Sequence, residues 1–263
     1  MNMAQNIYDN PDFFAGYSQL PRQVQGLDGA PEWPAIRALL PEVAGKRVAD
    51  LGCGFGWASR WFREQGAETV LGIDLSRKMI DRALADTDDP AINYRIADLD
   101  TLELSDAAFD LIYSALTFHY VRDFGLLMRT LHRALTRGGD LVFTIEHPIF
   151  MAAIHPDWIE DENGRKTWPV NGYSTEGERS TNWFRRGGAE AASDTGDYDK
   201  HLDRRGLRSA TDRGICTDIG PDRGDAKAGR RDGAANDVDG FGIQELISFP
   251  PGPTGRAACY RMP

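Results

Sequence analysis

Residues 48–57 read VADLGCGFGW, and this stretch decides the fold class. Its apolar beginning predicts a β-strand, and its three alternating glycines predict a tight turn before a helix that begins at Trp57. Glycine lets the backbone adopt positive φ and approach a ligand closely. Ligands of open α/β sheets bind beyond the carboxyl ends of the strands. A G-x-G pattern also occurs in ordinary strand-to-helix turns, so the downstream sequence has to support a binding site.

Strands and helices alternate along the chain on both sides of this turn. Apolar runs and turn residues predict strands at 47–50, 69–73, 93–96, 109–114 and 140–145. Helices are expected at 31–40, at 57–65, from a cap at Ser76 to Ala85, and from a cap at Asp123 to Leu135, where Gly138 and Gly139 would end it. The alternation indicates parallel strands joined by right-handed crossovers. We therefore expect an α/β fold with a doubly wound, Rossmann-like and mostly parallel sheet.

Three carboxylates accompany the glycine turn. Asp74 ends the second predicted strand about 20 residues downstream, where ribose hydroxyls of a bound nucleotide need an acceptor. Asp98 follows the third strand and could accept a hydrogen bond from an adenine amino group. Asp50 precedes the first glycine by two residues, where it suits an ammonium group better than a phosphate. Together they predict a site for a nucleoside that carries an amino group.

NAD is the competing cofactor, because an acidic residue after the second strand suits both ligands. A dinucleotide fingerprint requires a third glycine at position 57 for close packing of helix on strand, and this chain has Trp57 there. Trp57 and Asp50 together favour S-adenosylmethionine over NAD.

Five segments carry a resemblance to a known family: VADLGCGFGWASRW, VLGIDLS, RIADLD, FDLIYSALTFHYV and GGDLVFTIEHP. The chain resembles the UbiE-like group (methyltransferase type 11) of class I S-adenosylmethionine-dependent methyltransferases over residues 6–184. The resemblance implies a set of cofactor-binding residues: Asp50, Gly52, Cys53, Gly54 and Gly56 at the methionine portion, Asp74 at the ribose, Leu75 and Met79 against the adenine, Asp98 and Leu99 at its amino group, and Ser114 and Ala115 on the sulfonium side.

Methyl transfer needs no obligatory catalytic side chain, because the sulfonium supplies the driving force and the protein supplies alignment. Two histidines are candidates for a base. His147, directly after the fifth strand, is a general base, a substrate contact or a hydrogen-bonded structural residue. His119, after the fourth strand, borders the cofactor or packs in the core. We expect no metal.

Aromatic residues of the N-terminal arm could form a lid. Tyr8, Phe14 and Tyr17 could exclude water from the sulfonium and present aromatic faces to it. Simple hydrophobic anchoring of the arm is an equal alternative. The segment 151–184, which follows the fifth strand, is expected to shape the substrate pocket, by analogy with other folds only.

The charge balance and composition restrict the partners. The chain has 263 residues, a formal charge of −10 and a pI near 5.0, so phosphate backbones are repelled and a small-molecule substrate is the better expectation. Three distant cysteines give neither a disulfide framework nor a zinc spacing. No apolar run is long enough to span a membrane, so we expect a cytoplasmic protein without a membrane partner. The sequence gives no indication of the oligomeric state.

The C-terminal part departs from the family. Between Gly187 and Gly240 the only aromatic residue is Tyr198, and no apolar period survives. One-base shifts of the reading frame at 189–200 and 231–240 permit segments that resemble the usual family ending. We interpret 185–263 as a disordered, frameshifted tail, with a divergent natural tail as the alternative, and expect the C-terminal strands to be missing. The expected units are therefore a lid and helix at 1–40, a cofactor-binding core at 41–150, an insertion at 151–184 and this tail.

The lead hypothesis is a methyltransferase that transfers a methyl group from S-adenosylmethionine to a small molecule by in-line displacement. One alternative is a non-catalytic remnant, inactive because of its altered C-terminus. A further alternative is an NAD-dependent oxidoreductase.

Overall fold

The computed structural model describes residues 6–146, 153, 158–171, 244–248 and 257–262. The strands are β1 (Arg47–Leu51), β2 (Thr69–Asp74), β3 (Ile92–Ile96), β4 (Phe109–Ala115), β5 (Leu135–Glu146), β6 (Ile159–Glu160), β7 (Lys166–Thr167), β8 (Gln244–Ser248) and β9 (Ala257–Met262). The α-helices are α1 (Pro11–Tyr17), α2 (Pro21–Val24), α3 (Trp33–Leu39), α4 (Trp57–Glu64), α5 (Arg77–Ala85) and α6 (Phe124–Ala134). Short 3-10 helices are η1 (Ile7–Asp9), η2 (Gly26–Gly29), η3 (Leu99–Thr101) and η4 (Phe118–Tyr120).

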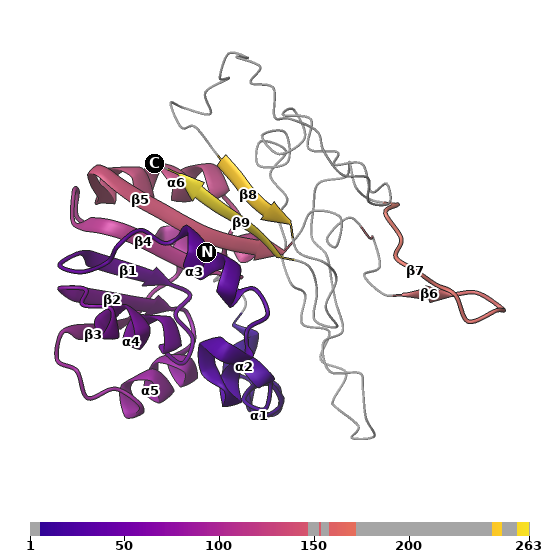
Figure 1. Cartoon of the computed structure of the whole chain (residues 1–263). Helices are drawn as coiled ribbons and strands as arrows, with labels where there is room; N and C mark the ends of the chain where they lie inside the picture. The colour runs from indigo at the N-terminus through magenta and orange to yellow at the C-terminus, as the bar shows by residue number, and fades with distance from the viewer. Residues whose placement is uncertain (1–5, 147–152, 154–157, 172–243, 249–256, 263) are drawn as a thin grey trace, which may run out of the picture.

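The large sheet has the strand order β3-β2-β1-β4-β5-β9-β8, and its first five strands are mutually parallel (Figure 1). This confirms the predicted doubly wound, Rossmann-like sheet. The order runs outward from β1 in both directions, so the topological switch point lies between the carboxyl ends of β1 and β4. At that point Leu51 is the register partner of Ser114.

The two C-terminal strands are present, which corrects the expectation that they are missing. β9 pairs antiparallel with β5 from Leu141↔Met262 to Glu146↔Ala257, and β8 pairs antiparallel with β9. The physical reason is the edge that β5 would otherwise expose, because unpaired strand groups are satisfied by any compatible extended segment. Figure 1 shows β8 and β9, in yellow, continuing the sheet beyond β5. The frameshift hypothesis concerns residues that mostly lie outside the described ones, and it stays a prediction.

The sheet has an apolar core on each face, as alternation along its strands requires. On one face Leu51, Ile112 and Phe143 form a buried cluster with Leu127 and Leu131 of α6. On the other face, the strand residues Val48, Val70 and Tyr113, which have the opposite parity, form a cluster with Ile36 of α3 and Phe62 of α4. Each strand therefore presents alternate side chains to two helical layers, and its carboxyl end is left for the loops.

Two helix caps were predicted correctly. The Ser76 hydroxyl accepts a hydrogen bond from the amide of Met79 at 3.2 Å, and the Asp123 carboxylate accepts one from the amide of Leu126 at 2.8 Å. Both side chains satisfy an amide that the first helical turn leaves unpaired.

The end of α6 differs from the prediction. Gly138 and Gly139 were expected to end the helix, but α6 stops at Ala134 and β5 begins at once. The register of β5 against β4 jumps from Leu135 to Asp140, so both glycines lie in a bulged part of the strand. Gly138 has a φ of +79°, and a Cβ on Gly139 would lie 3.1 Å from a side-chain atom of Leu135. The two glycines thus allow a bulge in the strand. Local sequence does not distinguish this role from that of ending a helix.

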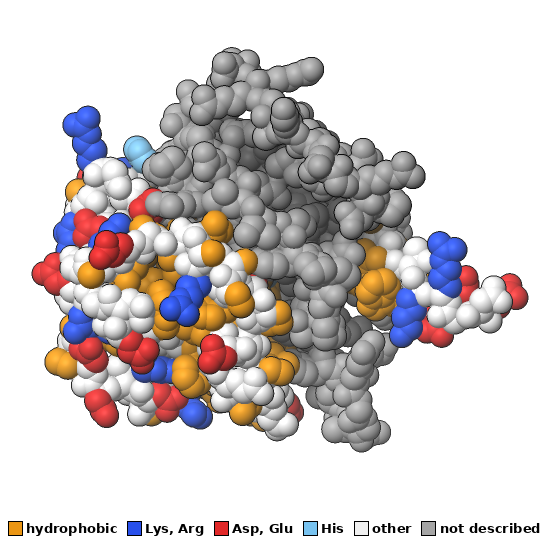
Figure 2. Space-filling view, in the orientation of Figure 1, with side chains coloured by type: hydrophobic (Ala, Val, Ile, Leu, Met, Phe, Trp, Pro, Cys, Tyr) orange, Lys and Arg blue, Asp and Glu red, His pale blue; other side chains and the backbone are white. Residues whose placement is uncertain are grey.

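The surface carries charges of both signs. In the face of Figure 2, the basic and acidic side chains of the described residues are interspersed and form no continuous basic patch on it. Among the described residues, no helix combines the length and the apolar composition needed to cross a membrane.

Candidate functional site

The turn after β1 is held by backbone contacts to the end of β2. Gly52, Gly54 and Gly56 have φ values of +73°, +52° and +74°, which L-residues rarely adopt. The amides of Gly52 and Cys53 both donate to the carbonyl of Ile73, at 2.7 and 3.0 Å. The space around a Cβ built on Gly54 is empty to 4 Å. The turn is therefore anchored to the end of β2, and it leaves open space at Gly54.

Thr117 lies against this turn from the other side of the switch point. A Cβ on Gly52 would overlap the Thr117 side chain, so only glycine fits there. Thr117 donates its hydroxyl to the carbonyl of Ala115 at 3.0 Å. It follows Leu116, a non-glycine residue with φ +51° whose amide donates to the carbonyl of Thr144 at 2.9 Å. A strained turn after β4 thus places Thr117 over the glycine loop.

Asp74 connects the ends of β1 and β2. One carboxylate oxygen accepts from the amide of Gly54 and the other from the amide of Ser76, each at 2.9 Å. Burial raises the pKa of Asp74, although these backbone hydrogen bonds oppose the increase. Each carboxylate oxygen has two lone pairs. Asp74 therefore fixes the glycine loop to the turn that follows β2.

Asp50 occupies a different environment from the one predicted. Its side chain is 1% exposed, and one oxygen accepts from the Ser59 hydroxyl of α4 at 2.6 Å. Burial raises the pKa of Asp50 to about 7, the nearby Asp74 carboxylate adds to the increase, and the Ser59 hydrogen bond opposes it. Asp50 thus ties α4 to β1 beneath the glycine loop, and its contact with the methionine portion stays a prediction.

The titration of Asp50 gives a testable pH dependence. An unfolded Asp ionises near pH 3.9, so from about pH 4 to 7 the folded state binds more protons and its stability falls as pH rises. We expect the free energy of unfolding of Asp50→Asn, relative to the natural sequence, to increase over this range by up to about 1.4 kcal/mol per pH unit. Urea unfolding at several pH values measures this difference in unfolding free energy.

The control is Asp88→Asn, a change at an exposed side chain, whose unfolding free energy should vary with pH as that of the natural chain does. Parallel curves for Asp50→Asn and the natural chain would contradict the assignment.

The remaining predicted cofactor residues divide into surface and interior groups. Asp98 follows β3 and caps η3, accepting from the amide of Asp100 at 2.9 Å, and Leu99 packs against the α6-side core. Ser114 is fully buried and donates to the carbonyl of Leu51 at 2.7 Å, so it joins β4 to β1 rather than lining a surface. Ala115 is partly buried against the opposite core. The amide of Ala97, the neighbour of Asp98, donates to the carbonyl of Asp74 at 3.0 Å, so Asp98 lies next to the end of β2, whereas Ser114 acts from inside the sheet.

The residues around the start of α5 are mostly buried. Met79 is 2% exposed and Leu75 is partly exposed.

Cys53 of the glycine loop is a buried free thiol, and burial together with Asp50 and Asp74 raises its pKa well above the ordinary value. Cys53 is therefore held in its uncharged form within the loop.

The three predicted lid residues lie in one aromatic cluster over the glycine loop. The rings of Phe14 and Tyr17 lie 5.6 and 6.3 Å from the ring of Phe55, and Tyr8 lies 5.1 Å from Tyr17. Burial raises the pKa of Tyr17 to about 12, and the Asp74 carboxylate adds to the increase.

The two candidate bases have different outcomes. His119 lies in η4, is 5% exposed, and its ring centroid is 4.2 Å from that of Tyr120. His147 lies outside the described residues. A catalytic role for either histidine stays a prediction.

Comparison with known proteins gives the family. A profile described as a methyltransferase domain matches residues 49–143. The crystal structure of an S-adenosylmethionine-dependent methyltransferase from Mesorhizobium loti is 39% identical, with a TM-score of 0.68, and the match covers 90% of this chain and 99% of that one. This chain belongs to the S-adenosylmethionine-dependent methyltransferases. Its cofactor is S-adenosylmethionine, which decides against the NAD alternative.

Two further relatives extend the comparison. A candidate S-adenosylmethionine-dependent methyltransferase from Listeria monocytogenes is 26% identical, with a TM-score of 0.64, and the match covers 88% of this chain and 96% of that one. Malonyl-[acyl-carrier protein] O-methyltransferase of Pseudescherichia vulneris is 34% identical over 145 residues, which are 55% of this chain and 53% of that enzyme.

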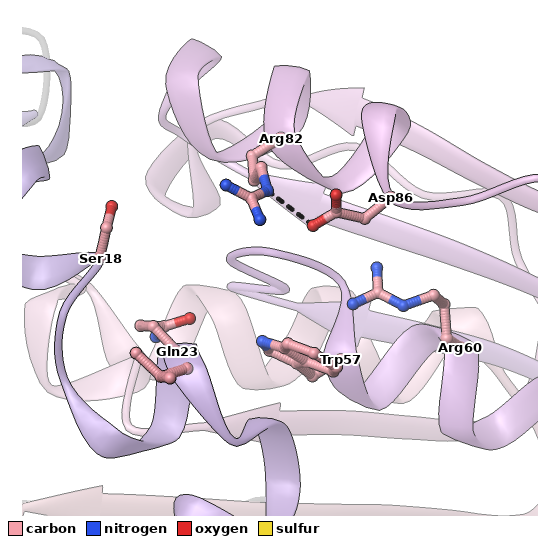
Figure 3. Close-up of a pocket in the computed structure, with 7 residues that line it drawn as sticks. Ser18, Gln23, Trp57, Arg60, Arg82 and Asp86 are labelled. Atoms are coloured by element: carbon pink, nitrogen blue, oxygen red, sulfur yellow. Dashed lines mark hydrogen bonds and ion pairs between the residues drawn. The ribbon is translucent and has the colours of Figure 1, made fainter.

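Position 57, where a dinucleotide fingerprint would have glycine, is Trp57 in this methyltransferase. Its side chain lines a cavity. The cavity has a volume of about 500 Å³ and lies between the N-terminal arm and helices α4 and α5 (Figure 3). Arg60 lies over the Trp57 ring at 4.7 Å, and Arg82 pairs with Asp86 at 2.7 Å. The first residue of α4 is thus used for packing against the arm.

Four residues of this methyltransferase were not predicted as members of the site. Ser59 and Thr117 contact the predicted residues Asp50 and Gly52. Ser76, recognised as a helix cap only, donates its amide to Asp74 and its hydroxyl to Asp9. The Ser59 and Asp9 contacts join positions 9 and 67 residues apart, and the Thr117 contact follows from a clash, so no local pattern indicates these three.

Proposed function

We propose that this methyltransferase transfers the methyl group of S-adenosylmethionine to a small-molecule acceptor by in-line displacement. The observation that carries the proposal is the convergence of Asp74, the open glycine loop and Asp98 at the carboxyl ends of three adjacent strands. This is the position of ligands in open α/β sheets. The acceptor positions of Asp74 suit the two ribose hydroxyls of the cofactor.

The other contacts follow from the course of the strands. We expect Asp98 and Leu99 at the adenine amino group, and Leu75 and Met79 beneath the adenine ring. Gly52, Gly54 and Gly56 allow the methionine portion to approach the backbone, with Cys53 buried among them. Asp50, which accepts a hydrogen bond from Ser59, would support the glycine loop and so help to position the methionine portion. Ala115 would shape the sulfonium side from the end of β4, and Ser114 would support that side from inside the sheet through its hydrogen bond to Leu51.

Bound S-adenosylmethionine supplies an activated methyl group, so the chain has to supply alignment and a dry site. Phe14 and Tyr17, packed against Phe55, would exclude water from the loop. On the other side of the glycine loop, Leu116 and Thr117 would hold the turn after β4 in place. His119 and His147 are the residues that we propose to test as a base for an acceptor that has to lose a proton.

A carboxylate is the first acceptor class to test. The support is the similarity to malonyl-[acyl-carrier protein] O-methyltransferase, of which this chain matches only about half. The acceptor class therefore has to be determined by experiment. Amines and hydroxyl compounds form the rest of the acceptor panel.

Two measurements test the proposed function. We expect calorimetric titration to detect binding of S-adenosylhomocysteine, and a screen with tritiated methyl donor to detect transfer to one acceptor class. The natural chain and Asp74→Asn are compared, so that background methylation is removed. Binding without transfer to any of the acceptors would favour the non-catalytic remnant. Thermal stabilisation by NADH but not by S-adenosylhomocysteine would overturn the proposal.

A further inference from the structure

The beginning of α5 receives a side chain from the N-terminal arm. One carboxylate oxygen of Asp9 accepts from the Ser76 hydroxyl at 2.6 Å and from the Lys78 amide at 3.1 Å. Asn6 donates to the carbonyl of Leu75 at 3.4 Å and to the other oxygen of Asp9 at 2.6 Å. The arm is therefore attached by hydrogen bonds to the turn that follows β2.

These bonds continue to the glycine loop. Ser76 is fully buried, and its amide donates to Asp74, whose second oxygen accepts from the amide of Gly54. Asp9, Ser76, Asp74 and Gly54 thus form one unbroken series of hydrogen bonds. Each distance in the series is 2.9 Å or shorter.

A second contact joins the same parts of the chain. The Phe14 ring of α1 lies 5.6 Å from the Phe55 ring of the glycine loop, and the Lys78 ammonium lies 5.4 Å from the Phe14 centroid. The arm therefore contacts the beginning of α5 and the glycine loop together. Its position cannot change without altering both.

The charge of Asp9 suits this place. Partial burial opposes its ionisation, but the hydrogen bonds from Ser76 and Lys78 hold the pKa of Asp9 below its ordinary value. A carboxylate near the first turn of a helix is also favoured by the helix dipole. The charge of Asp9 is thus maintained at neutral pH, which strengthens its hydrogen bond to Ser76.

We propose that Asp9 is a positioning residue for the cofactor: docking of the arm fixes Asp74 through Ser76, so arm docking and cofactor binding stabilise each other. The inference rests on the proposed role of Asp74 as the ribose acceptor. Coupling between two binding events is reciprocal. Cofactor binding therefore holds the arm on α5, and loss of the Asp9 contact weakens the cofactor.

The first test measures binding of S-adenosylhomocysteine by calorimetry. Asp9→Ala should raise the Kd at least about fivefold, the lower end of typical coupling between sites. Asp9→Asn keeps an acceptor oxygen and should restore part of the loss. Asp12→Ala, which removes an exposed carboxylate from the same arm, should leave the Kd within about twofold. An unchanged Kd in Asp9→Ala would overturn the inference, and melting curves of each variant verify that it is folded.

The second test asks whether Asp9 acts through Asp74. In an Asp74→Asn background the effect of Asp9→Ala on Kd should shrink to less than about twofold, because the series of bonds is already broken. An equal loss in both backgrounds would mean that Asp9 only stabilises the fold, and would overturn the inference.

The third test uses the arm itself. S-adenosylhomocysteine should slow tryptic cleavage at Arg22 of the natural chain more than that of Asp9→Ala. Equal protection would contradict the coupling. If the natural chain binds no S-adenosylhomocysteine, the proposed function fails. If it binds the ligand and Asp9→Ala binds it equally well, only this inference fails.

Discussion

Asp74→Asn is expected to weaken binding of S-adenosylhomocysteine by about 100-fold or more. The carboxylate offers four acceptor positions, of which the amides of Gly54 and Ser76 use two. Asparagine has one oxygen, and its amide group would face one of these N–H donors. Hydrogen bonds that two ribose hydroxyls donate to a charged group contribute about 1.5 to 3 kcal/mol each, and each 1.4 kcal/mol corresponds to a tenfold change in affinity. Calorimetric titration of both proteins measures the difference.

The matched control is Asp81→Asn, which removes the same charge from an exposed position of α5. Its Kd should stay within about twofold of the natural chain. A folded Asp74→Asn protein with unchanged affinity would remove Asp74 from the site, and with it the proposed mode of ribose recognition.

Gly52→Ala is expected to lower the free energy of unfolding by about 3 kcal/mol. A φ of +73° costs an L-residue about 1–2 kcal/mol, and overpacking costs about 1–3 kcal/mol. Both apply here, because the new Cβ overlaps the Thr117 side chain. Such a loss is a large fraction of the stability of a typical domain. Urea unfolding monitored by far-ultraviolet circular dichroism measures it.

Two variants separate the backbone cost from the clash. Gly45 has a φ of +71°, and a Cβ built there meets no atom within 4 Å. Gly45→Ala should therefore show the backbone cost alone. Gly52→Ala combined with Thr117→Ala should recover part of the loss. Equal effects of Gly45→Ala and Gly52→Ala would mean that Thr117 does not restrict the loop.

The parallel core was predictable because its information is local. Apolar runs, turn glycines and the caps Ser76 and Asp123 determine where strands and helices begin. Right-handed crossovers and the position of the glycine turn then predict where the cofactor binds. Asp74 and Asp98 were placed correctly at strand ends, because their strands were.

The remaining features depend on contacts between distant parts of the chain. The Asp50 carboxylate is buried and accepts a hydrogen bond from Ser59. No pattern in the sequence indicates this contact. Ser114 was misplaced for the same reason, because its hydroxyl donates to the distant carbonyl of Leu51. The pairing of β9 with β5 was missed because an unusual composition separates the two strands. Burial and long-range pairing override local pattern in each case.

The late position of β9 has a consequence for synthesis on the ribosome. β5 ends at Glu146 and β9 begins at Ala257, so 110 residues separate an edge from the strand that covers it. At about 5–20 residues per second, translation of this segment takes about 5 to 20 seconds. During that interval the nascent chain presents the β5 edge to its neighbours on the polysome. Chaperone binding in this interval should therefore influence the yield of native enzyme.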